Sequence, residues 1–199
     1  AYGSTCQMVY DFIYQLGYEN LLNKTVATCL YTGIVTDSGG FRFPKTTSAT
    51  HKCVADLIDR GINNSEIHNL LFDDSTYNRL LLLGKALQNL KILNEYKTSY
   101  ITLSQDELNA FGHQKGDTEG IVNYGLSIKG IDFTAIFIEN KEEGIVKISF
   151  RSQGAFDVNQ FARTYFEGGG HINAAGGKSF LTLEETVQKF IAILATEKK

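Results

Sequence analysis

GGGHINAAGG, residues 168–177, is the stretch of this 199-residue sequence that says most about its fold. Three consecutive glycines permit positive φ and allow amide N–H groups to converge on an anion. His171 follows directly and adds a donor or a positive charge, and the small residues behind it permit very close packing. A glycine run alone is typical of a turn or linker. The apolar strand pattern in front of this one indicates a binding loop within a folded domain.

The pattern around this loop predicts strands that alternate with helices. Two apolar runs, at 132–139 and 145–152, flank the polar turn 140–144 and predict a β-hairpin. Asp157 can cap a helix over 158–166 that leads into the glycine loop. We also expect strands at 99–103 and 178–180, and helices at 105–111, 118–127 and 183–196. This alternation favours an α/β fold with a mixed sheet.

The first half of the chain is predicted to be helical. We expect helices at 4–17, 23–34, 46–60, 65–71 and 76–93. The first has an apolar face at Val9, Phe12, Ile13 and Leu16 that needs a packing partner. Because no methionine precedes Ala1, we expect an N-terminal portion to be missing; removal of an initiator methionine before alanine is the alternative. The leucine-rich helix 76–93 is interpreted as a connector between two bodies.

Composition narrows the classes of function. The net charge of −3 disfavours binding to long duplex DNA, which requires many cationic contacts with phosphates. Three cysteines without C-x-x-C spacing favour reduced thiols and a cytoplasmic location. No stretch is long and apolar enough to predict a membrane span, so we expect no membrane partner.

Arg151 and Ser152, at the end of the strand 145–152, form one candidate site with the glycine loop. Arginine offers a planar fork for bidentate contact with phosphate, and Ser152 adds a hydroxyl. Together with the amides of the loop and His171, these side chains are expected to surround one anion. The alternatives are a solvated strand end for Arg151 and a helix-capping or core histidine for His171.

A second candidate is Asp37, in a turn-rich segment predicted over residues 35–43. A carboxylate is a good ligand for Mg²⁺ or Mn²⁺, and Arg42, five residues on, could contact a phosphate. The alternative is an Asp-Ser-Gly-Gly turn in which the Asp37 side chain caps its own backbone.

Together these motifs resemble the DHH–DHHA1 phosphoesterase family. TGIVTDSGGFR, residues 32–42, is similar to the family's fourth catalytic motif, and FRS at 150–152 followed by FEGGGH at 166–171 is similar to the DHHA1 signature. The resemblance implies the C-terminal helical part of a DHH catalytic domain at 1–75, a connector helix at 76–94 and a complete DHHA1 substrate-binding domain at 95–199. The family's Asp-His-His motif is not found in this sequence.

The resemblance also implies an activity. Members use two Mn²⁺ ions, one of which Asp37 would bind, and the DHHA1 domain would hold the substrate through Arg151, Ser152, Gly168, Gly169, Gly170 and His171. The resemblance implies Asp37 and His171 as the catalytic residues. The expected reaction is hydrolysis of short oligonucleotides (nanoRNA) or of small phosphates such as 3′-phosphoadenosine 5′-phosphate. Since Asp37 alone cannot build a two-metal site, this chain by itself is predicted to be an inactive, truncated form. A homodimer is possible.

Other activities stay open at this point. Within the enzyme class they are cyclic-dinucleotide hydrolysis, exopolyphosphatase activity and a RecJ-like exonuclease. The alternative from another class is a DHHA1-type nucleic-acid-binding module without catalysis, because such domains also occur as appended parts of alanyl-tRNA synthetases. The Asp37 segment favours the enzyme, since a pure binding module would not need it.

Overall fold

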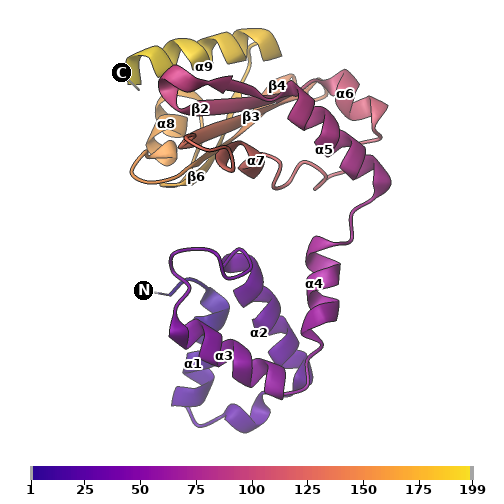
Figure 1. The fold of residues 1–199 in the computed structure, drawn as a ribbon, viewed down its shortest axis with the longest axis vertical. Helices are drawn as coiled ribbons and strands as arrows, with labels where there is room; N and C mark the ends of the chain where they lie inside the picture. Colours follow the sequence, from indigo (N-terminus) through magenta and orange to yellow (C-terminus); the bar gives the residue numbers. More distant parts are fainter. Residues whose placement is uncertain (1, 198–199) are drawn as a thin grey trace. The chain divides into compact units, whose positions relative to one another are not determined.

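The computed structural model describes residues 2–197 and divides the chain into two compact units. The first comprises residues 1–74 and the second residues 75–199 (Figure 1). We call them the helical unit and the sheet unit. Within residues 2–197, no helix is both long enough and apolar enough to cross a membrane.

The helical unit is built from capped helices around one apolar core. Its elements are α1 (Thr5–Gln15), the 3₁₀ turn η1 (Glu19–Leu21), α2 (Lys24–Asp37), α3 (Ser48–Asp59) and α4 (Asn64–Phe72). Side-chain oxygens of Ser4, Asn23 and Thr47 accept amide hydrogens in the first turns of α1, α2 and α3, as N-caps do. Ile34, Val35 and Leu57 are fully buried in the core between α2 and α3.

The predicted apolar face of α1 is largely exposed. The only fully buried residue of this helix is Gln7, whose Oε1 accepts the Thr50 hydroxyl hydrogen at 2.9 Å. Ile13 packs against the core, but Val9, Phe12 and Leu16 are 42%, 59% and 50% exposed. The expected packing partner of this face therefore stays a prediction.

The sheet unit is a six-stranded mixed sheet with helices packed on it, and it confirms the predicted α/β class. Its elements are α5 (Tyr77–Asn89), β1 (Lys91–Leu93), η2 (Asn94–Tyr96), β2 (Thr98–Leu103), α6 (Gln105–Ala110), α7 (Asn123–Leu126), β3 (Phe133–Asn140), β4 (Ile145–Ser152), α8 (Val158–Tyr165), β5 (Gly169–His171), β6 (Ala174–Ser179) and α9 (Leu183–Glu197). The strand order is β1-β2-β3-β4-β6-β5, with β2 and β3 parallel and the other pairs antiparallel.

The two faces of this sheet have different chemistry. Strand β4 alternates between buried and more exposed positions, as one buried face requires. Phe133, Phe137 and Phe150 lie on one side with α8 and α9, where Phe190 joins them in the largest core cluster. On the other side, Leu82 of α5 and Ile121, two residues before α7, form a buried cluster with Ile136 of β3.

Three predicted elements differ from the structure. The helix expected at 76–93 ends at Asn89, and residues 91–93 form β1. This helix, α5, belongs to the sheet unit and packs on it through Leu82 and Ala86. The helix expected at 118–127 is only the four-residue α7, because Gly120 has a positive φ of 82° that breaks a helix. The glycine loop is the β5–β6 hairpin.

Candidate functional site

Arg151 lies in a row of residues that crosses five strands. In register, Ser99 of β2 pairs with Thr134 of β3, Thr134 with Arg151 of β4, Arg151 with Ala174 of β6, and Ala174 with His171 of β5. Side chains of paired residues point to the same face of a sheet. The sheet thus places Arg151 and His171, which are 20 residues apart in sequence, on one face with only the small Ala174 between them.

The positive charge of Arg151 has no carboxylate partner within residues 2–197. Its Nη1 donates to the carbonyl oxygen of Phe150 at 2.9 Å. The side chain is partly buried, and this burial lowers the pKa of Arg151 from its usual value. A partly desolvated cation without a counter-charge is costly, so an anion bound here would be stabilising.

His171 ends β5, the strand at one edge of the sheet, and its side chain is exposed. With one strand between them, the Cα atoms of His171 and Arg151 are separated by about 10 Å. Side chains of their length can both reach a phosphate group placed over Ala174. The structure thus brings together two of the predicted site residues.

Ser152 does not join them. As the next residue along β4, it points to the opposite face, and it is 6% exposed. Its hydroxyl donates to the carbonyl oxygen of Phe156 (2.7 Å) and accepts from Nδ2 of Asn173 (2.9 Å). The expected cluster of Arg151 and Ser152 around one anion is therefore wrong in geometry. In this structure Ser152 ties the β5–β6 turn to the end of β4.

The glycines serve close packing rather than an amide cradle. A Cβ atom on Gly168 would lie 1.9 Å from the carbonyl oxygen of Gly176. The amide of Gly168 donates to the carbonyl oxygen of Ala162 (3.2 Å), and the amide of Gly170 donates to Oδ1 of Asn159 (2.9 Å). These two amides are already bonded, which contradicts the expected convergence of the loop amides on an anion. Close packing of this stretch is confirmed.

Asp37 is the last residue of α2, not part of a loop. The helix continues past Ile34 because Ile34 and Val35 are both buried in the core. The Asp37 carboxylate is exposed and forms no ion pair within residues 2–197. The negative end of the helix dipole favours a cation near this position. A predicted turn follows: Phe41 has a positive φ of 68°, and its amide donates to the Ser38 hydroxyl.

Arg42 does not contact Asp37. Its Nε donates to the carbonyl oxygen of Gly39 at 2.8 Å, which braces the turn after α2. The side chain is otherwise exposed. Its expected contact with phosphate stays a prediction.

The residues that the structure describes contain no group of three or more His, Cys, Asp or Glu side chains arranged to hold a metal ion. These residues alone do not fit a two-metal centre. The assignment of Asp37 as a manganese ligand stays a prediction from the resemblance.

Two lysines that no sequence motif singles out lie on the same face as Arg151. Lys147 of β4 pairs with Lys178 of β6, and it lies four positions before Arg151 on the same strand, so both side chains point to the same face. We call this side of β4 and β6 the open face; it carries Lys147, Ser149, Arg151, Ala174, Gly176 and Lys178, none of them buried. The period-two spacing from Arg151 could have identified Lys147. Lys178 can be assigned to this face only when the register of β4 and β6 is known.

Comparisons with known proteins agree with this architecture. A sequence model described as the DHHA1 domain matches residues 94–197. The bifunctional oligoribonuclease and PAP phosphatase NrnA of Bacillus subtilis is 33% identical over 179 residues, which cover 89% of this chain and 55% of that protein. The protein of the same name from Thermus thermophilus is 31% identical over 196 residues, 98% of this chain and 57% of that protein.

A solved structure is also similar. The crystal structure of an exopolyphosphatase-related protein from Bacteroides fragilis matches with a TM-score of 0.95 and 37% identity, over 98% of this chain and 57% of that chain. The chain therefore spans a little more than half the length of the relatives that it matches.

Proposed function

The chain belongs to the DHH/DHHA1 family of phosphoesterases, and we propose that its sheet unit holds the phosphate groups of a short oligonucleotide or of a small nucleotide phosphate such as 3′-phosphoadenosine 5′-phosphate. The observation that carries this proposal is the partly buried guanidinium of Arg151, which has no carboxylate partner within residues 2–197 and lies in one row with His171. A guanidinium fork matches the oxygens of a phosphate, and an exposed imidazole beside it supplies another donor.

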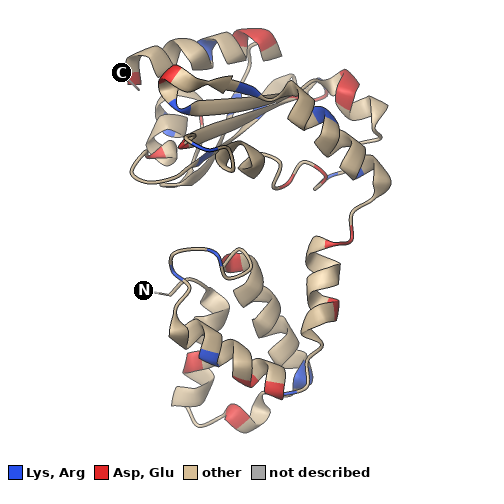
Figure 2. Cartoon of the chain, in the orientation of Figure 1, with Lys and Arg blue, Asp and Glu red and all other residues tan. Residues whose placement is uncertain are grey.

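A short substrate fits the charge of the protein better than a long duplex. Basic and acidic residues are interspersed over both units (Figure 2), and the net charge is −3. A long duplex needs many phosphate contacts, whereas a short oligonucleotide needs a few. The NrnA relatives carry the words oligoribonuclease and PAP phosphatase in their names, which supports the same substrate class here.

Arg151 and His171 would contribute positioning and electrostatic stabilisation rather than a covalent step. Fixed donors lower the barrier when they hold the phosphate where negative charge develops. In the intact family member, Mn²⁺ ions would supply activation of water and neutralisation of charge. Because the described residues do not form such a centre, we expect negligible hydrolysis by this chain alone, and the proposal is tested by binding.

The experiment is calorimetric titration of the 199-residue chain with 3′-phosphoadenosine 5′-phosphate. We expect Arg151→Gln to weaken binding about thirtyfold, the loss of a charged hydrogen bond worth about 2 kcal/mol. The matched control is Lys52→Gln, which removes one positive charge from an exposed position on α3. Equal affinity in the Arg151 variant and the wild type would contradict the proposed site, as would equal losses in both variants.

A non-catalytic binding module is the second candidate, because the DHHA1 match covers only residues 94–197. Both candidate functions predict binding of a short oligonucleotide, so only an assay of hydrolysis can distinguish between them. The enzyme predicts release of mononucleotide from a dinucleotide in the presence of Mn²⁺ by the protein that carries the family's full set of motifs. Binding of the same dinucleotide without any release by that protein would favour the module.

A further inference from the structure

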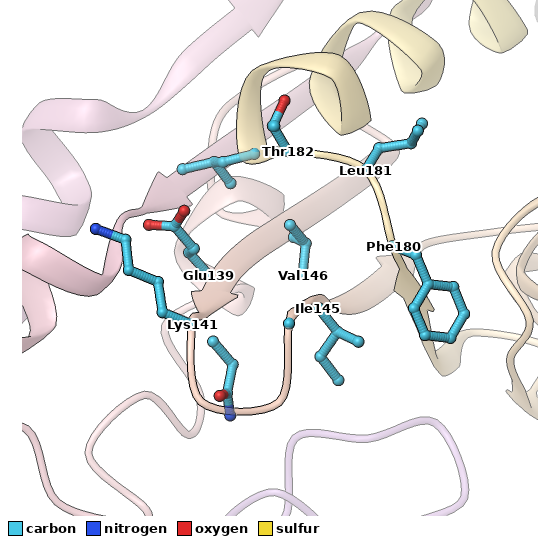
Figure 3. A pocket seen from close by; sticks show the side chains of 10 residues that line it. Glu139, Lys141, Ile145, Val146, Phe180, Leu181 and Thr182 are labelled. Atoms are coloured by element: carbon cyan, nitrogen blue, oxygen red, sulfur yellow. The ribbon is translucent and has the colours of Figure 1, made fainter.

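The open face continues past the two lysines to an exposed aromatic ring. Phe180 follows Lys178 by two residues and is 63% exposed, and the Nζ atom of Lys178 lies 5.0 Å from the centre of its ring. Across from Phe180, Ile145 begins β4. Figure 3 shows the side chains of Phe180 and Ile145 on the same side of the hairpin, with Val146 directed to the other side. An aromatic side chain beside a cation is the combination on which single-stranded nucleic acid stacks.

The two charged groups on β4 are held apart. Lys147 and Arg151 are four residues apart, which separates their Cα atoms by about 13 Å along the strand. The Nζ atom of Lys147 leans toward Glu143, in the turn before β4, whereas the guanidinium of Arg151 stays at the carbonyl of Phe150. One phosphate group cannot contact both side chains in these positions. Two separate phosphates can.

The lysine pair is itself unfavourable without an anion. Directly opposite like charges destabilise a pair of strands. Lys147 pairs with Glu143, and Lys178 with Glu167 at the longer distance of 3.7 Å, and all four side chains are at least 44% exposed. Exposed ion pairs of this kind are weak, so a phosphate could displace the carboxylates at small cost.

Ser149 and Gly176 form the floor between the lysines and Arg151. They are opposite each other in the β4–β6 register and have little or no side chain above the sheet. A Cβ atom on Gly176 would meet only the carbonyl oxygen of Ile148, at 3.5 Å. Backbone phosphates and riboses can therefore approach the strands closely between the two charged ends.

We propose that the open face is an extended track for single-stranded oligonucleotide: Arg151 holds one phosphate, Lys147 and Lys178 hold a second one further along the strand, and Phe180 stacks on a base beyond it. This inference rests on the proposed function, because it takes the Arg151 end as the place of the terminal phosphate. The track makes Lys147, Lys178 and Phe180 determinants of substrate length. A dinucleotide reaches only the Arg151 end, and a longer oligomer occupies the whole track.

The test compares two ligands, pApA and pentaadenylate, titrated into the 199-residue chain in EDTA so that no metal-dependent cleavage occurs. We expect the double variant Lys147→Gln, Lys178→Gln to weaken pentaadenylate binding about tenfold and to leave pApA binding unchanged. The plot of log K against log salt for pentaadenylate should become shallower by about 0.7, since one phosphate contact is lost. We expect Phe180→Ala to weaken pentaadenylate about tenfold with an unchanged salt slope, because stacking carries no charge.

Matched controls are available for each change. Lys141→Gln removes an exposed lysine that pairs with Asp106 at the β3–β4 turn, and Tyr77→Ala removes an aromatic side chain that is 75% exposed on α5. Neither should alter the discrimination by length. Equal losses for pApA and pentaadenylate in the lysine variant, or no loss for either ligand, would overturn the track. If the wild-type chain binds neither ligand, the proposed function fails with it; if pApA binds and Arg151→Gln weakens it, only the track is in question.

Discussion

The carboxylate of Asp37 and the guanidinium of Arg151 both lack an ionic partner within residues 2–197, yet their surroundings differ. Asp37 stands exposed at the end of α2, and it belongs to no group of three or more His, Cys, Asp or Glu side chains among the described residues that could hold a metal ion. Arg151 is partly buried in a sheet that aligns it with His171 and with two lysines. The helical unit thus offers one exposed carboxylate, and the sheet unit offers one face with several cationic side chains.

This difference between Asp37 and Arg151 indicates whether each residue can act without further groups from outside its own unit. A metal ligand acts only in a group, because several donors must converge on one ion. A phosphate-binding surface can act by itself, since each cation contributes separately. We therefore expect changes in the sheet unit to alter binding by this chain, and the same kind of change in the helical unit to alter stability alone.

The largest effect is expected from Gly168→Ala. The new Cβ would lie 1.9 Å from the carbonyl oxygen of Gly176, so the β5–β6 hairpin must shift. We expect a loss of about 3 kcal/mol in the unfolding free energy of the sheet unit. Hydrogen exchange at the amides of β4 and β6 measures this loss of unfolding free energy. The amides of α2, which belongs to the helical unit, serve as an internal reference.

The control is Gly84→Ala in α5, where the added methyl group meets no atom within 4 Å. Replacing a helical glycine in open space should stabilise the protein by about 0.7 kcal/mol. If Gly168→Ala proved as harmless as Gly84→Ala, the tight packing of the glycine stretch would not exist.

The second prediction separates the two units by ligand binding. We expect His171→Ala to weaken 3′-phosphoadenosine 5′-phosphate about tenfold in metal-free buffer, through loss of one donor to the phosphate. Asp37→Asn, in the helical unit, should leave this affinity unchanged. Calorimetric titration of both variants with 3′-phosphoadenosine 5′-phosphate measures the two affinities. A loss in the Asp37 variant without metal would show that the carboxylate acts on the phosphate site by some route other than an ion.

Much of the sheet unit could be predicted from sequence because its signals are local. The hairpin of β3 and β4, the Asp157 cap and the final helix follow from apolar runs and turn residues. The site depends instead on register. His171 lies near Arg151 only because β6 is placed between β4 and β5 in the sheet. The sequence of β4 does not predict that this strand pairs with β6.

Two further differences from the sequence predictions, at Asp37 and Ser152, have causes that are visible only in the tertiary structure. Ser38 and the two glycines after it predict a loop around Asp37, but burial of Ile34 and Val35 carries α2 through to Asp37. Adjacency in the sequence predicts Ser152 as a partner of Arg151, but adjacent residues of a strand face opposite sides. Sequence identifies the chemistry of such residues more readily than their direction.

The smallest effect is expected at Asp56, a charged residue of the helical unit that we compare with Arg151 of the sheet unit. Its Oδ2 accepts from Nε of Arg60 (3.0 Å) and from the hydroxyl of Tyr10 (3.1 Å). Burial alone would raise the pKa of this carboxyl, but the hydrogen bonds from Arg60 and the tyrosines Tyr14 and Tyr10 outweigh it and hold the pKa below the usual 3.8. Unlike the charge of Arg151, that of Asp56 is fully matched inside the protein, so it should stabilise the fold and play no part in binding.

A carboxyl whose pKa is lower in the folded state stabilises the protein above its unfolded pKa and loses that contribution as the pH falls through the folded value. We therefore expect Asp56→Asn to cost about 1 kcal/mol of unfolding free energy at neutral pH. The difference from wild type should shrink as the pH falls below 3.8. Urea unfolding followed by NMR signals of the α3 amides measures it, with Asp59→Asn, on the same helix, as the control. A difference that stays constant with pH would mean that the Asp56→Asn substitution acts by disturbing packing and not by removing the charge of Asp56.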